Sequence, residues 1–369
     1  MSERLKDIVI SILFVVVIIG VFIFNLILKD NDISVSERRK LAKFPSIDSS
    51  IFSESLTDEI EEYAMDQFLL RDEFRSIKTF VKLDILRQKD NNGLFIVDEN
   101  IHKIEYPLDE KSVLNVAQKI NNVYDKYLNE NFNVFYSIVP DKNYFLDDES
   151  IYLKLDYKKL NDIMHENINS NIKYIDIYNE LSSNDYYNTD THWKQQNIVK
   201  IANKIAKEIG FSDRITEEFE TKKYTDEFYG AYYGQLGKNV NPDRIEYLTN
   251  SYIENAITYN YETSKEAKIY DIQKADASMD KYDLFLSGAT PIIEIRNNNA
   301  KTDKELVIFR DSFGSSIAPL FTQAYSKIIL VDIRYISTDL ISNYISFNSN
   351  QDVLFLYSTL VINESGTLK

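Results

Sequence analysis

Cysteine is absent from this sequence of 369 residues, and histidine occurs only three times, as His102, His165 and His192. The absence of cysteine excludes disulfide bonds, thiolate metal sites and a cysteine nucleophile. Three well-separated histidines argue against a zinc cluster, and neither a metal nor another cofactor is predicted. A calcium or magnesium site of carboxylate oxygens stays open, although no loop has EF-hand spacing. A histidine base must therefore be one of these three.

Positive charge is in short supply. Lysine and arginine total 42, aspartate and glutamate total 58, and the formal net charge is −16. A phosphate backbone requires clustered lysine and arginine, so no nucleic-acid partner is predicted, and a general attraction to anionic lipid is disfavoured too. Apolar residues make up 44% of the chain and charged residues 27%, a mixture that can bury a core. The length predicts one large domain or two modest ones.

One long stretch carries no charge at all. Residues 8–28 read IVISILFVVVIIGVFIFNLIL, and as a helix they would span about 30 Å, the thickness of a bilayer core. A cleaved signal peptide would have a shorter apolar region and a small-residue cleavage site, which is missing after Leu28. Residues 8–28 are therefore predicted to be a transmembrane signal anchor behind a short tail, residues 1–7. A buried core helix is the disfavoured alternative, because its surface would be apolar all round.

The charges that flank this segment do not settle its orientation. The positive-inside rule alone would place the large domain in the cytoplasm, because only two basic residues precede the segment and more follow it. However, a long domain can translocate despite its charges, and the lack of cysteine suits an exported protein that does not rely on disulfides. We expect a single-pass protein of the cell membrane with its large domain outside the cytoplasm.

The rest of the chain divides into two regions. Residues 29–90 are predicted to form a stalk and N-terminal helices, with a break at Phe44-Pro45 and one helical pattern over 54–89. Residues 91–369 alternate between short β-branched runs and helical patterns, which predicts an α/β domain with a parallel, buried sheet flanked by helices. Strands are expected at 94–97, 134–139, 172–177, 306–309, 327–333 and 353–357, and helices at 112–128, 157–168 and 198–209.

Residues 211–300 interrupt this alternation. They are rich in tyrosine, asparagine and threonine, and the patterns at 245–252 and 292–295 favour antiparallel strands. We interpret this region as an insertion into the α/β domain or an elaboration of its edge.

A serine follows one of the predicted parallel strands. The run Phe309-Arg310-Asp311-Ser312-Phe313-Gly314 leads from an apolar strand into a helical pattern. Sites in open α/β sheets form at the carboxyl ends of strands, and the amides of the next helical turn can stabilise an oxyanion. Serines are common in such loops, so this motif alone does not establish catalysis.

The best candidate for a base is His192. It lies just before a helical pattern, in Asp190-Thr191-His192-Trp193, and Asp190 can reach one imidazole nitrogen in a tight turn. An aspartate that fixes the tautomer, a histidine that takes a proton and a serine that attacks form a nucleophilic triad. The alternative is that Asp190 or Thr191 caps the helix and His192 packs there. His102 and His165 have no such setting at a strand end.

These motifs together resemble a known family. The Asp-Thr-His-Trp motif and the distant strand-Asp-Ser-Phe-Gly are similar to the SGNH-hydrolase-like proteins of alginate O-acetylation and the related DHHW proteins. Further similar segments, which extend the resemblance over about residues 34–358, are Glu37-Arg38-Arg39-Lys40-Leu41 to Phe44-Pro45, Asp66-Gln67-Phe68 to Arg71-Asp72, Ser137 to Lys142, Phe228-Tyr229-Gly230 and Asp332-Ile333-Arg334-Tyr335.

The resemblance implies a fold and an activity. It implies an SGNH-like, flavodoxin-like α/β domain in which Ser312 is the nucleophile, His192 the base and Asp190 its orienting partner. The implied protein moves acetyl groups onto a cell-surface polysaccharide, with a multipass membrane acyltransferase as the acetyl donor. Position 289 is alanine where related chains often have asparagine, so the backbone amides of Ser312 and Gly314 remain as the expected oxyanion donors.

Two questions stay open on the sequence alone. The triad would also serve an acetylesterase. Alternatively, the chain could be a non-catalytic protein of the envelope or of sporulation that keeps the fold to bind a glycan. Tyrosines around Gly230 either form a platform for sugar rings or, as the favoured alternative, pack against the sheet. The candidate substrate-binding residues are Trp193, Tyr229, Tyr232, Tyr233 and Arg310.

Overall fold

The computed structural model describes residues 3–46, 54–147 and 149–369, and the chain divides into two compact units. The first unit contains residues 1–92 together with 233–239. The second contains residues 93–232 and 240–369. The division at 92/93 lies close to the predicted start of the α/β domain, whereas segment 233–239, which the sequence places in that domain, groups with the first unit.

The first unit is mostly helical. Its N-terminal helix α1 is long and apolar enough to cross a membrane, and none of its most apolar stretch is buried, although a signal sequence would have the same character. The elements of this unit are α1 (Glu3–Ile27), β1 (Ile33–Ser34), β2 (Arg39–Lys40), α2 (Glu54–Asp66), α3 (Arg71–Phe80) and a π-helical turn Val81–Ile85, with part of α7 (Ala231–Leu236).

The single helical pattern predicted over 54–89 is wrong in one respect, because the helix is broken between α2 and α3. Leu70, the N-cap residue of α3, has a left-handed backbone with φ of 56°, so the chain changes direction between α2 and α3. The end of α2 is tied down by Asp66, whose carboxylate accepts hydrogen bonds from Arg39 Nη1 at 2.7 Å and from the Ala42 amide at 2.9 Å. These contacts join two segments that resemble the family's N-terminal region.

The second unit is built on an eight-stranded mixed sheet. Strands β13, β12, β14, β5 and β6 run parallel, and β11, β9 and β10 extend the β13 edge in antiparallel fashion. The strands of this sheet are β5 (Asn133–Val139), β6 (Lys173–Tyr174), β9 (Ile257–Asn260), β10 (Lys265–Lys268), β11 (Ile292–Arg296), β12 (Glu305–Arg310), β13 (Lys327–Val331) and β14 (Gln351–Ser358).

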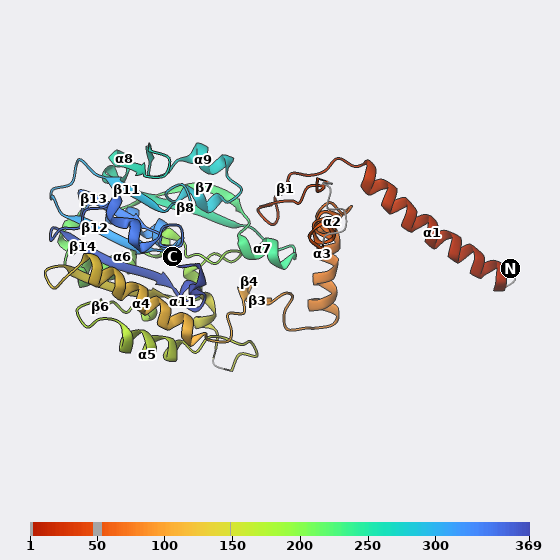
Figure 1. The fold of residues 1–369 in the computed structure, drawn as a ribbon, viewed down its shortest axis with the longest axis horizontal. Helices are drawn as coiled ribbons and strands as arrows, with labels where there is room; N and C mark the ends of the chain where they lie inside the picture. The colour runs from red at the N-terminus through yellow and green to blue at the C-terminus, as the bar shows by residue number, and fades with distance from the viewer. Residues whose placement is uncertain (1–2, 47–53, 148) are drawn as a thin grey trace. The chain divides into compact units, whose positions relative to one another are not determined.

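Helices cover both faces of this sheet. Figure 1 shows α4 and α5 along one face, where their apolar sides share a core with alternate residues of the parallel strands. Helices α6 and α10 share the other core cluster, and Gly210, with φ of 95°, ends α6. The bounds are α4 (Glu110–Tyr127), α5 (Tyr157–Asn167), α6 (Val199–Ile209), α8 (Ser251–Asn255), α9 (Ile272–Ala277), α10 (Phe313–Ile317) and α11 (Thr359–Asn363).

The predicted fold class is confirmed, with corrections at the edges. The strand expected at 172–177 is only β6, which pairs with β5 alone. The strand expected at 94–97 is not part of the main sheet, because β3 (Leu94–Val97) pairs with β4 (Asn100–Lys103). The region 211–300 is both an insertion, the hairpin of β7 (Glu220–Phe228) and β8 (Asp243–Thr249), and an edge elaboration of the main sheet.

Candidate active site

Ser312 lies at the carboxyl end of a central parallel strand. Strand β12 has parallel neighbours on both sides, and Ser312 follows it after one residue, Asp311, as the N-cap residue of α10. The preceding residue fixes this turn, because the Asp311 carboxylate accepts the Phe313 amide at 3.0 Å and the Ser358 amide at 2.7 Å. The nucleophile candidate is therefore held between the ends of β12 and β14.

Asp190, His192 and Ser312 form a connected chain of hydrogen bonds. The Ser312 Oγ is 2.7 Å from His192 Nε2, and His192 Nδ1 is 2.6 Å from Asp190 Oδ1. A carboxylate only accepts hydrogen bonds, so Nδ1 carries the proton and Nε2 is the acceptor for the serine hydroxyl. The Asp190 carboxylate also accepts the amides of His192 at 3.1 Å and Ala231 at 2.7 Å. This arrangement suits general-base activation of a serine.

Aromatic side chains surround the imidazole. The Tyr282 ring stacks on His192 with centroids 3.9 Å apart and planes within 9°. Its hydroxyl donates to Ser316 Oγ at 2.9 Å, and Trp193 Nε1 donates to the same oxygen at 2.8 Å. The imidazole plane is thereby fixed by a stacked ring, which the sequence did not single out.

The loop that carries Asp190 is held by the insertion. Asp243, at the start of β8, accepts the amides of Asn188 at 2.9 Å and Thr189 at 2.7 Å, and also the Thr189 hydroxyl at 2.7 Å. The Thr189 hydroxyl in turn accepts the Gly230 amide at 2.8 Å. No sequence pattern marks Asp243, because its partners lie more than 50 positions away.

A buried lysine lies beside the same loop. Lys142 Nζ donates to the carbonyls of Tyr187 at 3.0 Å and Asn188 at 3.3 Å, and it lies over the Tyr232 ring. Burial lowers the pKa of Lys142 to about 7, although attraction to Asp190 and Asp243 opposes that shift. The sequence resemblance includes this lysine but gives it no role.

The other two histidines lie elsewhere. His102, in β4, pairs through Nδ1 with Asn143 Oδ1 at 3.0 Å, and burial lowers its pKa to about 4. His165 lies in α5 with its ring against Tyr174. Over residues 3–46, 54–147 and 149–369, no three histidine or carboxylate side chains gather closely enough to hold a metal ion.

The candidate substrate-binding residues differ in exposure. Trp193, Arg310 and Tyr232 are buried, so their side chains support the site from within. Tyr229 is 38% exposed, and Tyr233 belongs to the first unit. Of the predicted oxyanion donors, the Gly314 amide already donates to the Asp311 carbonyl at 3.1 Å, which leaves the Ser312 amide as the predicted donor.

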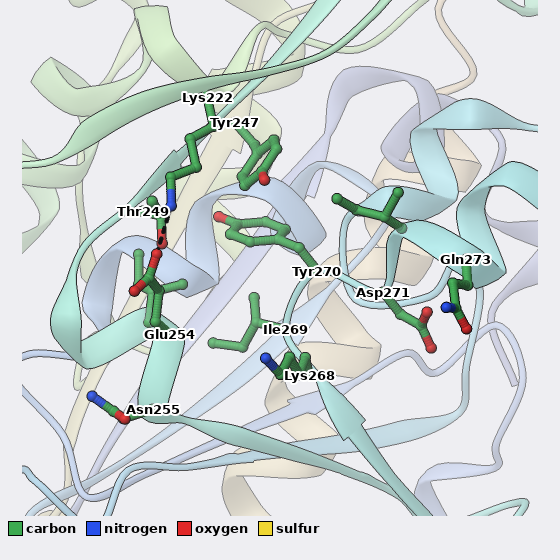
Figure 2. A pocket seen from close by; sticks show the side chains of 12 residues that line it. Lys222, Tyr247, Thr249, Glu254, Asn255, Lys268, Ile269, Tyr270, Asp271 and Gln273 are labelled. Atoms are coloured by element: carbon green, nitrogen blue, oxygen red, sulfur yellow. Dashed lines mark hydrogen bonds and ion pairs between the residues drawn. The ribbon is translucent and has the colours of Figure 1, made fainter.

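Hollows of different size open on the surface of the second unit. One of about 480 Å³ is lined by Arg334 and Tyr335, after β13, and by Leu360, Val361 and Glu364 of the α11 segment. The hollow is lined by segments that follow β13 and β14, the two strands that flank β12. The larger hollow in Figure 2, about 800 Å³, includes Tyr247 and Tyr270 and lies between the β7–β8 hairpin and the start of α9.

Solved structures share this fold. A DHHW family protein from Eubacterium siraeum has 23% sequence identity and a TM-score of 0.59 over 74% of this chain and 93% of its own. Bacillus cereus PatB1 has 17% identity and a TM-score of 0.58 over 74% of this chain and 97% of its own. The structure of the same protein with a sulfonyl adduct has 17% identity and a TM-score of 0.56 over 73% of this chain and 95% of its own.

The comparisons place the chain in a fold class. The similarity to the DHHW family that the motifs indicate is confirmed at the level of fold, and the predicted SGNH-like α/β architecture is confirmed with it. No family model matches the chain, and no curated protein matches it by sequence. The particular activity therefore has to be proposed from the site itself.

Proposed function

We propose that the protein is a membrane-anchored O-acetyltransferase that acts on a cell-surface polysaccharide through Ser312, His192 and Asp190. The observation that carries this proposal is the pair of distances, 2.7 Å from Ser312 to His192 and 2.6 Å from His192 to Asp190, at the carboxyl end of β12. The Asp-Thr-His-Trp motif and the fold of the DHHW and PatB1 structures support it.

The reaction takes place in two balanced steps. Ser312 Oγ attacks the carbonyl carbon of an acetyl ester while its proton passes to His192 Nε2, and the departing alcohol takes that proton as the acyl bond to the donor breaks. A sugar hydroxyl then gives its proton to His192 and attacks the acetyl-serine, and the proton returns to Ser312 as the sugar ester leaves. Asp190 keeps the imidazole in the required tautomer throughout.

The hollow lined by Arg334 and Tyr335 is the proposed acceptor position. Tyr335 offers a ring face and Arg334 offers guanidinium donors there, and Arg334 is oriented by two hydrogen bonds to Asp332, at 2.9 and 2.7 Å. Transfer requires that a sugar hydroxyl be placed better than water, since orientation outweighs the concentration of water. The acetyl donor is proposed to be a multipass membrane acyltransferase, and α1 would hold the second unit outside the cytoplasm near it.

The test combines glycan analysis with active-site labelling. Deleting the gene, or replacing it with Ser312→Ala, should remove acetyl groups from an envelope glycan, as measured by mass spectrometry. Asp190→Asn should lower the turnover of an artificial acetyl ester by about 10³- to 10⁴-fold through loss of the imidazole orientation. A sulfonyl fluoride, whose sulfur is attacked by activated serines with loss of fluoride, should modify Ser312 in the wild-type protein and leave the Ser312→Ala variant unmodified.

The matched control is Ser315→Ala, a neighbouring serine that is buried in α10 outside the triad. It should keep ester turnover and labelling. Glycans that become more acetylated on deletion would identify an acetylesterase instead. Unchanged acetylation in both the deletion and the Ser312→Ala strain would leave a non-catalytic glycan-binding protein.

A further inference from the structure

One side of α3 exposes large apolar side chains. Leu70, Phe74, Ile77 and Ile85 are 55%, 55%, 57% and 59% exposed. They recur at spacings of four, three and eight residues and therefore lie along one side of the helix and its π-helical continuation. We refer to these four residues as the apolar stripe. In a water-soluble helix this side would be buried, so its exposure requires an explanation.

The orientation of α3 is fixed by its opposite side. Thr79 is buried and donates to the Leu236 carbonyl at 2.7 Å, and Ser76 donates to the Gly237 carbonyl at 3.0 Å. Arg75 donates to the Gly234 carbonyl of the same segment. The polar side of α3 is thus the side that packs within the first unit, and the apolar stripe faces outward as a consequence.

The stripe begins beside the end of α1. The Leu69 amide donates to Asn25 Oδ1 at 2.8 Å, and Asn25 lies in the last turns of α1. If α1 spans a bilayer, as proposed above, Asn25 lies where the hydrocarbon core meets the head groups. Leu70, the next residue after this contact, then starts the apolar stripe at the same depth.

Hydrophobicity rather than charge is what the stripe offers. Lys78 and Lys82 flank it and can extend to the head groups, but Asp72, Glu73 and Asp84 lie on the same segment. With opposite charges interspersed and a net chain charge of −16, attraction to anionic lipid is not the driving force. The partner that fits is the interfacial layer of a neutral bilayer, into which amphipathic helices insert their apolar side.

We infer that α3 lies in the membrane surface, with Leu70, Phe74 and Ile77 among the outer acyl chains. This inference rests on the proposed membrane anchor. It gives the first unit two contacts with the bilayer, the span of α1 and the apolar stripe of α3, which together fix the rotation of that unit about α1.

The absence of cysteine allows a direct test with single nitroxide labels. The full chain is reconstituted in phosphatidylcholine nanodiscs, with one cysteine introduced at a time. The variants are Val16→Cys in the centre of α1, Phe74→Cys and Ile77→Cys on the stripe, and Asp72→Cys as the control at an exposed polar position of the same helix. Relaxation by oxygen, which concentrates in lipid, is compared with relaxation by a water-soluble nickel chelate.

Labels at positions 74 and 77 should be relaxed mainly by oxygen, at a shallower depth than the label at 16. The label at 72 should be relaxed mainly by nickel. If the label at 16 is in lipid while those at 74 and 77 respond to nickel, the inference is overturned and the anchor stands. Protection of 74 and 77 from both reagents would show a protein covering and would overturn it too. If the label at 16 responds mainly to nickel, the proposed membrane anchor is contradicted, and the inference is overturned with it.

Discussion

The loop of the proposed nucleophile, Ser312, and the loop of the proposed base, His192, are built in different ways. Ser312 is placed by the strand that precedes it, because β12 lies between two parallel neighbours and leads straight into α10. Asp190 and His192 lie in a loop whose position depends on distant side chains, above all Asp243 and the backbone at Gly230. The position of the Ser312 loop therefore follows from the geometry of the sheet, and the position of the Asp190–His192 loop depends on contacts with the insertion.

Outside the proposed triad, the largest expected effect comes from filling the space at Gly230. A Cβ there would collide with the Cβ of Asp190 and would lie 2.5 Å from the Thr189 carbonyl oxygen, so the backbone of the base loop would have to move. A displacement of about 1 Å in a catalytic group costs on the order of 10²-fold in rate. Gly230→Ala should therefore lower kcat for an acetyl ester by about that factor or more, as measured by steady-state kinetics.

The control for this prediction is Gly366→Ala, where a Cβ meets no atom within 4 Å. It should leave kcat unchanged. Full activity of Gly230→Ala would mean that the insertion does not position the base, and the distinction between the two loops would be lost.

This contrast also explains what the sequence could predict. The position of Ser312 was predictable, because an apolar run followed by Asp-Ser-Phe-Gly describes a strand that ends at the carboxyl edge of the sheet. The Asp190–His192 pair was predictable as well, because the two residues are close in sequence. Asp243 and Tyr282 were not predictable, since each meets the loop through contacts that only the folded insertion creates.

The prediction of strands and helices was also limited to elements whose sequence pattern is imposed by their immediate neighbours. Long buried strands such as β5, β12 and β14 matched their apolar runs, because two flanking strands impose the pattern. The edge strand β6 did not match, since only one neighbour holds it. The break at Leu70 was missed because the apolar spacing of three and four residues continues across a left-handed residue without a glycine to mark it.

A smaller effect is expected from Asp243→Asn. The Asn188 and Thr189 amides donate to different oxygens of Asp243, so the new amino group faces one of these amides and that buried hydrogen bond to a charged group is lost. We expect a loss of about 2–3 kcal/mol in the free energy of unfolding, measured by urea denaturation. A drop of about tenfold in kcat should accompany it, because the base loop is held less tightly.

Asp226→Asn is the matched control, since Asp226 lies on the same hairpin but pairs with Lys223 and Arg244 at the surface. Exposed ion pairs contribute little, so its effect on both measurements should be small. Equal effects of the two variants would show that Asp243 acts as an ordinary surface acid and not as the support of the base loop.

The effect expected at Lys142 is on stability, and it should depend on pH. Burial lowers the pKa of Lys142 to about 7, whereas an unfolded lysine titrates near 10.5. Between these values the unfolded chain binds one more proton than the folded chain at this position, so the stability of the wild type should rise from pH 7 to pH 10. Below pH 7 both states are protonated and this contribution is constant, with the buried charge at its most costly.

Lys142→Met removes the titrating group and keeps a side chain of similar length. The difference in unfolding free energy between the Lys142→Met variant and the wild-type protein should therefore favour the variant most at pH 6–7 and shrink toward pH 10, as measured by urea denaturation at a series of pH values. Taking the difference cancels the titration of the other lysines and tyrosines, and Lys268→Met, at an exposed position, should show no such trend. A difference independent of pH would mean that Lys142 keeps its proton in the fold. The base loop would then be held by a permanent ammonium group through Tyr187 and Asn188, and not by an amine that is neutral above pH 7.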